Sequence, residues 1–178
     1  MTEQDRLAFW TKALNLPGFQ VVHERRDTPA DPLLLTVAPD LPLGLCPDCR
    51  RATANVHRTH ESAAVKDLPL GPQPVELLVR TYQFHCPHCG AFFSPRHDAL
   101  APGAHATERF LEQAARLIRF SDVQNAAAFL GVPEKTLERW YYDYVERQQQ
   151  TPPANLKPIK SIGIDELSLK KHRQSSSR

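Results

Sequence analysis

The amino-acid sequence predicts an α+β fold made of several small modules, and three observations lead to this expectation. The four cysteines of the chain form two CxxC pairs, Cys46/Cys49 and Cys86/Cys89. Extended, β-branched and aromatic segments surround these pairs, whereas apolar residues recur at helical spacing after residue 107. Sixteen prolines gather at the joints between segments. A chain of 178 residues divided in this way favours two or three small modules over one large core.

Residues 1–45 are expected to form an N-terminal helix and a β-hairpin. Apolar residues recur at helical spacing within residues 3–14, and a Pro-Gly pair then ends the pattern. Two segments rich in Val, Leu and Phe follow, residues 19–25 and 33–37, with a proline-containing turn between them. The hairpin would lead directly into the first cysteine pair.

The two CxxC pairs predict a structural zinc site. Zinc prefers four soft ligands at tetrahedral angles, and two such turns supply four thiolates with no position left for water. The expected ligands of this cofactor are Cys46, Cys49, Cys86 and Cys89.

The zinc site would hold together a small β zinc ribbon over residues 46–103, because hairpins of this size cannot bury a core alone. Strands are expected at residues 54–60 and 75–84, where Val75, Leu77 and Val79 share one face. Phe92 and Phe93, just after the second pair, are expected to pack back over these strands.

A disulfide or a redox motif is the alternative for the cysteines. The chain begins without an apolar signal segment and has no long apolar run, which predicts a cytoplasmic protein whose thiols stay reduced and no membrane partner. Each CxxC has proline at its second position, unlike a redox motif at the start of a helix. His85 and His88 are competing ligands, but four thiolates already satisfy zinc.

Residues 104–150 are expected to form a helix-turn-helix module. Thr107 is a candidate N-cap for a helix that ends near Phe120, and a second cap follows at Ser121-Asp122. The segment from Val123 to Tyr142 fits the two-helix DNA-reading unit, with a glycine at the turn and Leu and Trp facing inward.

The second helix of this unit, residues 133–147, would be the recognition helix for double-stranded DNA. Arg139 is the first candidate for a base edge, and Lys135, Thr136 and Tyr142 are candidates for phosphates or neighbouring bases. The alternative is a plain helical hairpin, because the segment is not basic and the net charge of the chain is only +2.

The last 28 residues are expected to hold a linker and one strand. Thr151-Pro152-Pro153 ends the helix, and residues 151–160 have the composition of a linker. Residues 161–169 alternate like a strand around Asp165, which alone is as well explained as a solvated acid on an edge strand. Residues 157–178 carry six Lys and Arg against two Asp and Glu, and their Ser/Arg-rich end predicts a disordered tail.

Taken in order, these motifs resemble the N-terminal part of a bacterial insertion-sequence transposase of the ISL-three family. The resemblance is carried by LGLCPDC, KDLPLGPQPVELLVRTYQFHCPHCGAFF and IGIDELSLKKH, and it extends from about Leu14 to His172. It implies a zinc ribbon and a helix-turn-helix that bind the terminal inverted repeats of the element in the bacterial nucleoid. It also implies an RNase-H-like core that cuts and joins DNA with an Asp-Asp-Glu triad and two Mg²⁺ ions. By its place in IGIDE, Asp165 corresponds to the first acid of that triad.

The chain departs from the family pattern at its end. After Asp165 it offers only Glu166, whereas two divalent ions need several carboxylates from separate strands. Residues 161–178 are therefore expected to be the truncated start, an orphan first strand, of the RNase-H-like core. Strand transfer is not expected of this chain alone, and Mg²⁺ would bind only in a full-length parent.

The favoured hypothesis is site-specific DNA binding for DNA transposition and recombination, with no small-molecule substrate. Phosphate contacts are expected from four arginines of the ribbon: Arg50, Arg51, Arg58 and Arg80. A stand-alone transcriptional regulator or antitoxin is the alternative, in which the strand after residue 160 would serve a homodimer or another partner. An intact nuclease is the third hypothesis, and it would require Asp165.

Overall fold

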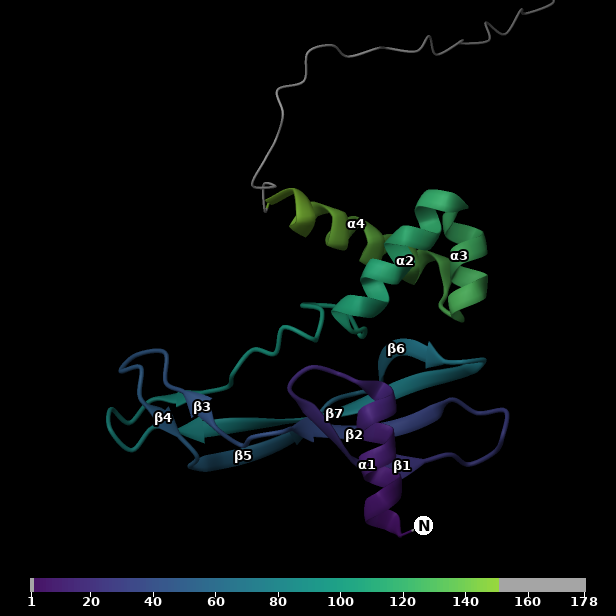
Figure 1. The fold of residues 1–178 in the computed structure, drawn as a ribbon. Helices are drawn as coiled ribbons and strands as arrows, with labels where there is room; N and C mark the ends of the chain where they lie inside the picture. The colour runs from purple at the N-terminus through teal and green to yellow at the C-terminus, as the bar shows by residue number, and fades with distance from the viewer. Residues whose placement is uncertain (1, 151–178) are drawn as a thin grey trace, which may run out of the picture.

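The fold is that of a computed structural model, which describes residues 2–150 (Figure 1). The elements in this range are, in order, α1 (Glu3–Leu14), β1 (Phe19–Arg25), β2 (Leu33–Pro39), β3 (Gly44–Leu45), β4 (Ala52–Thr53), β5 (Val56–Glu61), β6 (Val65–Leu70), β7 (Gln73–His85), β8 (Phe92–Phe93), α2 (Glu108–Phe120), α3 (Val123–Leu130) and α4 (Glu134–Gln150). The predicted mixture of helices and strands is confirmed. The expected linker at 151–160 and the strand with Asp165 lie outside the described residues.

A six-stranded sheet forms the lower layer of the molecule in Figure 1, and β7 is its central strand. The strands run in the order β1-β2-β7-β5, and β6 and β8 also pair with β7. The predicted N-terminal helix and hairpin are confirmed, since α1 is closed by a capping box at Thr2 and β1 pairs with β2 antiparallel. However, β2 also pairs with β7 in parallel, from Leu33↔Val75 to Val37↔Val79. The sheet thus crosses the boundary predicted after residue 45.

The core of the sheet lies on one face of β2 and β7. Val75, Leu77 and Val79 are all buried there, as the alternation of the sequence predicts. Leu35 and Val37 of β2 meet them, and Leu7 and Trp10 of α1 pack against the cluster. Burial of this apolar face is what fixes the register of the parallel pair.

The helices α2, α3 and α4 form a second layer over the β6 edge of the sheet (Figure 1). Thr107 and Asp122 cap α2 and α3, as predicted, and Gly131 takes the left-handed conformation with φ 62° between α3 and α4. Leu137 and Trp140 are buried against Phe110 and the small residues of α2 and α3. These three helices form the predicted helix-turn-helix.

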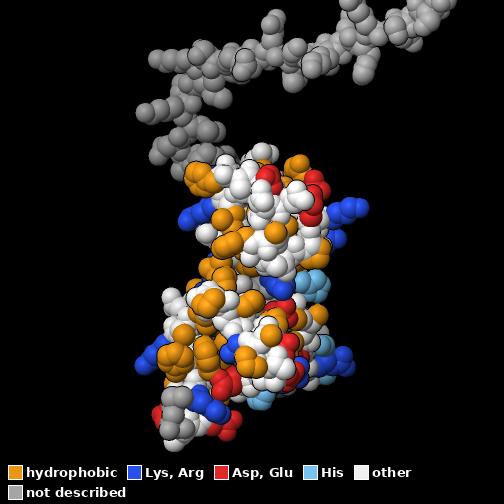
Figure 2. Space-filling model, turned by 90° about the vertical axis from the view of Figure 1, so that its right-hand side faces the viewer, with side chains coloured by type: hydrophobic (Ala, Val, Ile, Leu, Met, Phe, Trp, Pro, Cys, Tyr) orange, Lys and Arg blue, Asp and Glu red, His pale blue; other side chains and the backbone are white. Residues whose placement is uncertain are grey.

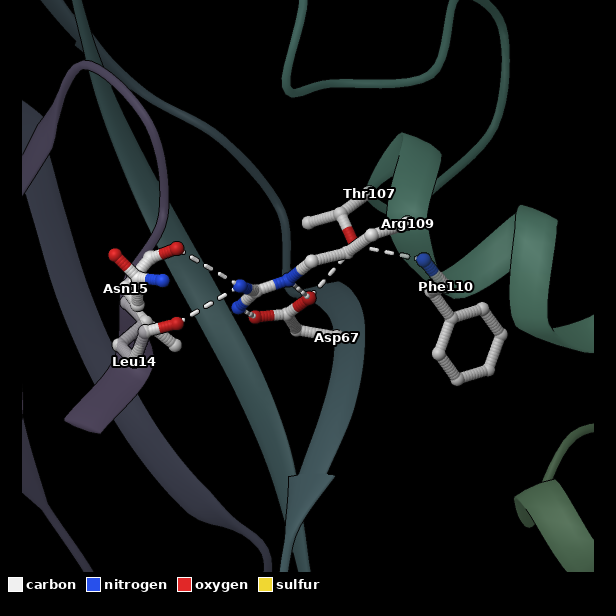
Figure 3. A network of polar contacts seen from close by, with 6 residues as sticks. All are labelled: Leu14, Asn15, Asp67, Thr107, Arg109 and Phe110. Carbon is white, nitrogen blue, oxygen red and sulfur yellow. Dashed lines mark hydrogen bonds and ion pairs between the residues drawn. The ribbon is translucent and has the colours of Figure 1, made fainter.

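A buried polar network joins the two layers (Figure 3). Asp67 of β6 accepts hydrogen bonds from the hydroxyl of Thr107 at 2.7 Å and from Nε of Arg109 at 2.8 Å, and its other oxygen forms an ion pair with the same guanidinium. Nη1 of Arg109 continues to the carbonyl oxygens of Leu14 at 2.8 Å and Asn15 at 3.1 Å, at the end of α1. Arg109 therefore links the buried carboxylate of β6 to the end of α1, so three elements that are remote in the sequence are joined.

The strand that carries Asp67 was not predicted. β6 contains Pro69, which has no N–H to donate to a sheet, and its pairing with β7 shifts register between Asp67 and Leu70. Backbone hydrogen bonds join the other edge of β6 to the segment that precedes α2, from Lys66 N to His105 O at 2.9 Å and from Thr107 N to Lys66 O at 3.0 Å. The helical layer thus begins directly from the sheet.

Candidate metal centre and nucleic-acid interface

The four cysteines meet at one end of the sheet, where they form a candidate metal centre. The Sγ atoms of Cys46, Cys49, Cys86 and Cys89 all lie within 4.8 Å of one another. The pairs Cys46–Cys89 and Cys49–Cys86 are each 3.5 Å apart, much longer than the roughly 2 Å bond of a disulfide. Four sulfurs around a zinc ion at tetrahedral angles are about 3.8 Å apart. The thiols therefore fit the predicted structural zinc ion and no disulfide.

The two CxxC turns have the same backbone geometry. In the first, Arg50 N donates to Cys46 O and Cys46 N to Arg51 O. In the second, Gly90 N donates to Cys86 O and Cys86 N to Ala91 O, at equivalent positions. The residue after each pair is left-handed, with φ 56° at Arg50 and φ 76° at Gly90. This repeated turn aims both thiols of each pair at one point.

The thiols carry charge unequally before a metal binds. Burial raises the pKa of the Cys86 thiol, but hydrogen bonds from the backbone N–H groups of His88 and Cys89, with those of neighbouring thiols, lower it to about 7. The pKa of Cys89 is lowered by the N–H of Ala91, yet the Cys46 thiol, burial and the other thiols raise it to about 12. Cys86 is thus partly ionised near neutral pH, whereas binding of zinc must displace the proton of Cys89.

The histidines of the second CxxC turn do not join this cluster of sulfur atoms. Nδ1 of His88 lies 3.0 Å from the guanidinium of Arg51, and Nδ1 of His85 lies 3.4 Å from the side-chain amide of Asn55. Both rings therefore contact side chains of the first half of the ribbon, and the ligand set remains four cysteines.

The candidate DNA contacts of the helical layer lie on α4. Lys135, Arg139 and Tyr142 are exposed at spacings of four and three residues, so they form one outward stripe. Thr136 is half-buried beside the turn, and its N–H bonds to the carbonyl of Pro133. Within residues 2–150 neither Lys135 nor Arg139 takes part in an ion pair.

The four arginines expected to contact phosphates have different surroundings. Arg50 and Arg58 are exposed and make no ion pair with any described residue. Arg51 is held by His88, and Arg80 lies 3.5 Å from Glu61 across the β5–β7 pair. Arg50 and Arg58 are therefore the arginines with the least competition for a phosphate.

Basic side chains do not gather into one patch on the face that Figure 2 shows, where they lie at separate places among acidic and hydrophobic ones. This agrees with the formal net charge of +2. Affinity for DNA would accordingly depend on a few placed contacts more than on a broad positive field.

Two comparisons with known families bear on these modules. Residues 42–89 match the family model described as zinc-finger of transposase IS204/IS1001/IS1096/IS1165. Residues 95–145 match the model described as helix-turn-helix domain of transposase family ISL3, and the two matches together cover more than half of the chain. The chain belongs to the ISL3 transposase family.

The resemblance that the sequence motifs indicate is thereby confirmed, and the zinc ribbon and helix-turn-helix of this ISL3-family chain indicate DNA binding in a transposase. No curated protein and no solved structure is significantly similar to the chain. None of the helices within residues 2–150 has the length and apolar character needed to cross a membrane. Neither family match supports the homodimer that the sequence left open.

Proposed function

We propose that this ISL3-family chain binds the terminal inverted repeats of its element, with α4 in the major groove and the zinc ribbon on adjacent phosphates. The observation that carries the proposal is the outward stripe of Lys135, Arg139 and Tyr142 on the second helix of a complete helix-turn-helix. Arginine can donate two hydrogen bonds to a guanine, which makes Arg139 the base-reading residue. Lys135 and Tyr142 would contact the flanking backbone.

The lack of ion pairs at these side chains within residues 2–150 supports this role. Lys135 and Arg139 have no acidic partner among the described residues that DNA would have to displace. Glu134 and Glu138 lie on the same exposed side of α4 and oppose a phosphate, so they favour a precise fit to one sequence over general attraction to DNA. Thr136, half-buried beside the turn, is the weakest candidate of the set.

The two halves would act together on DNA because the Asp67 network holds α2 against β6. Arg50 and Arg58 of the ribbon, which have no ion pair in residues 2–150, would then contact phosphates at a fixed separation from α4. Catalysis by Asp165 is not part of this proposal, because that residue lies outside the described residues.

The proposal is tested by fluorescence anisotropy with the zinc-loaded chain and two duplexes, the inverted repeat and a scrambled sequence of equal composition. Arg139→Ala should weaken binding to the repeat by about 2 kcal/mol and reduce the preference for it. Lys135→Ala should weaken binding to both duplexes and lower the salt dependence by about one charge. Lys12→Ala on α1 is the matched control and should change neither. Equal binding of both duplexes by the wild-type chain would refute the proposal.

A further inference from the structure

Three aromatic rings form a cluster on the ribbon, close to the metal centre. The ring of Phe92 stacks on that of His85, with centroids 4.7 Å apart and planes at 30°. On another side, the ring of His57 meets Phe92 edge-on at 4.8 Å. Phe92 nevertheless remains 55% exposed. The three rings form an aromatic cluster, here named the ring platform, which presents the exposed part of Phe92 to solvent.

Strand pairing and a β-bulge set the positions of these rings. His85 and Phe92 are direct partners in the β7–β8 pair, so their side chains emerge on the same face of the sheet. His57 is the extra residue of a bulge in β5, since Val56 pairs with Phe84 and Arg58 already pairs with Gln83. A bulge re-aims a side chain, and such irregularities are frequent next to functional sites.

Phe93 shows that the platform is not simply part of the core. It stacks on the buried ring of Phe84 at 5.7 Å, and the two rings leave so little space that a Cβ at Gly44 would approach them to 2.7 and 2.8 Å. The interior of the ribbon is therefore filled by Phe93. Phe92 points to the opposite face, where its ring packs on His85 of β7 and His57 of β5, so both phenylalanines pack over the strands as expected, although Phe92 stays largely exposed.

The charge around the platform fits a nucleic acid. Arg58 lies opposite Gln83, which is two residues from His85 on β7, so Arg58 emerges on the face of the platform. It has no ion pair among the described residues. The acid of β5, Glu61, pairs with Arg80 on the other face. An aromatic surface beside an unpaired guanidinium suits a planar base attached to a phosphate.

We propose that the ring platform of Phe92, His57 and His85 binds an unpaired nucleobase of DNA by stacking, with Arg58 on a neighbouring phosphate. Bases in a duplex are already stacked on both faces, so only a base in a single-stranded or opened segment can use the platform. This inference rests on the proposed function. It adds an unpaired base, bound by the ribbon, to the paired DNA that α4 would read.

The test compares two inverted-repeat duplexes of identical sequence, one blunt and one with a short single-stranded overhang, by fluorescence anisotropy with the zinc-loaded chain. The overhang should increase affinity about tenfold, the effect of one or two stacked bases. Phe92→Leu, which keeps an apolar side chain but removes the ring, should abolish that gain and leave blunt-duplex binding unchanged. Phe92→Trp should retain it. Phe120→Leu is the matched control, because Phe120 is a 91% exposed phenylalanine on α2 without flanking rings.

The outcomes separate this inference from the proposed function. If the wild-type chain gains nothing from the overhang, or if Phe92→Leu keeps the gain, the platform does not bind bases. If Phe92→Leu weakens blunt and overhang duplexes equally, the platform contacts paired DNA and the inference is again wrong. A chain that prefers no duplex sequence but binds a single-stranded oligonucleotide through Phe92 would overturn the proposed function alone. His57→Ala should reproduce the loss seen with Phe92→Leu, and zinc content verifies that each variant is folded.

Discussion

The sheet layer and the helical layer of this chain are stabilised by interactions of very different range. In the helical layer, Thr107 and Asp122 cap the starts of α2 and α3 and Gly131 caps the end of α3, with hydrogen bonds to residues three or four positions away. In the sheet layer, β2 pairs with a strand some 40 residues later, and Cys46 meets Cys89 across 43 residues. Local contacts form at little entropic cost, whereas long loops must be closed before their contacts stabilise anything. We therefore expect the cysteine-bearing end of the sheet to depend on zinc, and the helices to depend mainly on local contacts.

Removal of zinc should have the largest effect, and it should unfold part of the sheet layer while the helical layer stays folded. Zinc binding to small structural sites is worth on the order of 10 kcal/mol, so a chelator should unfold the ribbon around β3, β4, β5 and β8. The amide signals of α3 and α4 in a two-dimensional NMR spectrum should persist. Excess zinc should restore the ribbon signals, which controls for direct effects of the chelator. Loss of the helical signals at the same chelator concentration would contradict the comparison.

Asp67→Ala should be the next largest change, because it leaves the guanidinium of Arg109 and the hydroxyl of Thr107 without their buried acceptor. Removing one partner of such a pair costs about 3 kcal/mol, which urea unfolding followed by circular dichroism can measure. Arg116→Ala breaks an exposed pair with Glu112 on α2 and should cost no more than about 0.5 kcal/mol. Equal costs for the two variants would mean that the joint between the layers is not stabilising.

Replacing Gly44 or Gly131 by alanine should be destabilising for two different reasons, neighbouring atoms at Gly44 and backbone conformation at Gly131. Gly44→Ala in the ribbon drives a methyl group into Phe84 and Phe93 and should cost about 2 kcal/mol. Gly131→Ala meets no atom within 4 Å but must adopt a positive φ, and should cost about 1 kcal/mol. Thermal unfolding of the zinc-loaded variants measures both. A larger cost at Gly131 than at Gly44 would show that the ribbon interior is looser than its packing indicates.

The smallest expected effect comes from the two equivalent positions after the CxxC pairs. Arg50→Gly relieves a left-handed arginine, and should stabilise the free protein by about 0.5 kcal/mol once the greater chain entropy of glycine is subtracted. Gly90→Ala should destabilise it by about 1 kcal/mol. Both values come from thermal unfolding without DNA, since Arg50 is also a proposed phosphate contact. A destabilising Arg50→Gly would mean that its side chain supports the turn.

The sequence predicted those features that depend on neighbouring residues. Helix caps at Thr107 and Asp122, the turn at Gly131 and the alternation along β7 all follow from spacings within one element. The four cysteines were found because CxxC is itself a local signature of a metal site.

The parallel pairing of β2 with β7 could not be predicted, since it joins strands remote in the sequence. The same is true of Asp67, which in isolation resembles any acid near a proline and acquires its role only from Arg109. The opposite faces on which Phe92 and Phe93 lie were also not predicted, although side chains of adjacent residues alternate along a strand.

The segment that precedes α2 has a further consequence for the molecule, because it occupies the outer edge of β6. Lys66 and Ala106 form a parallel bridge there, and the backbone groups of Lys66 are hydrogen-bonded on that side. An uncovered edge strand is a template for pairing with another chain. Detachment of the helices would thus expose this edge to pairing with another chain, so the contact that joins the helix-turn-helix to the sheet also covers an edge strand.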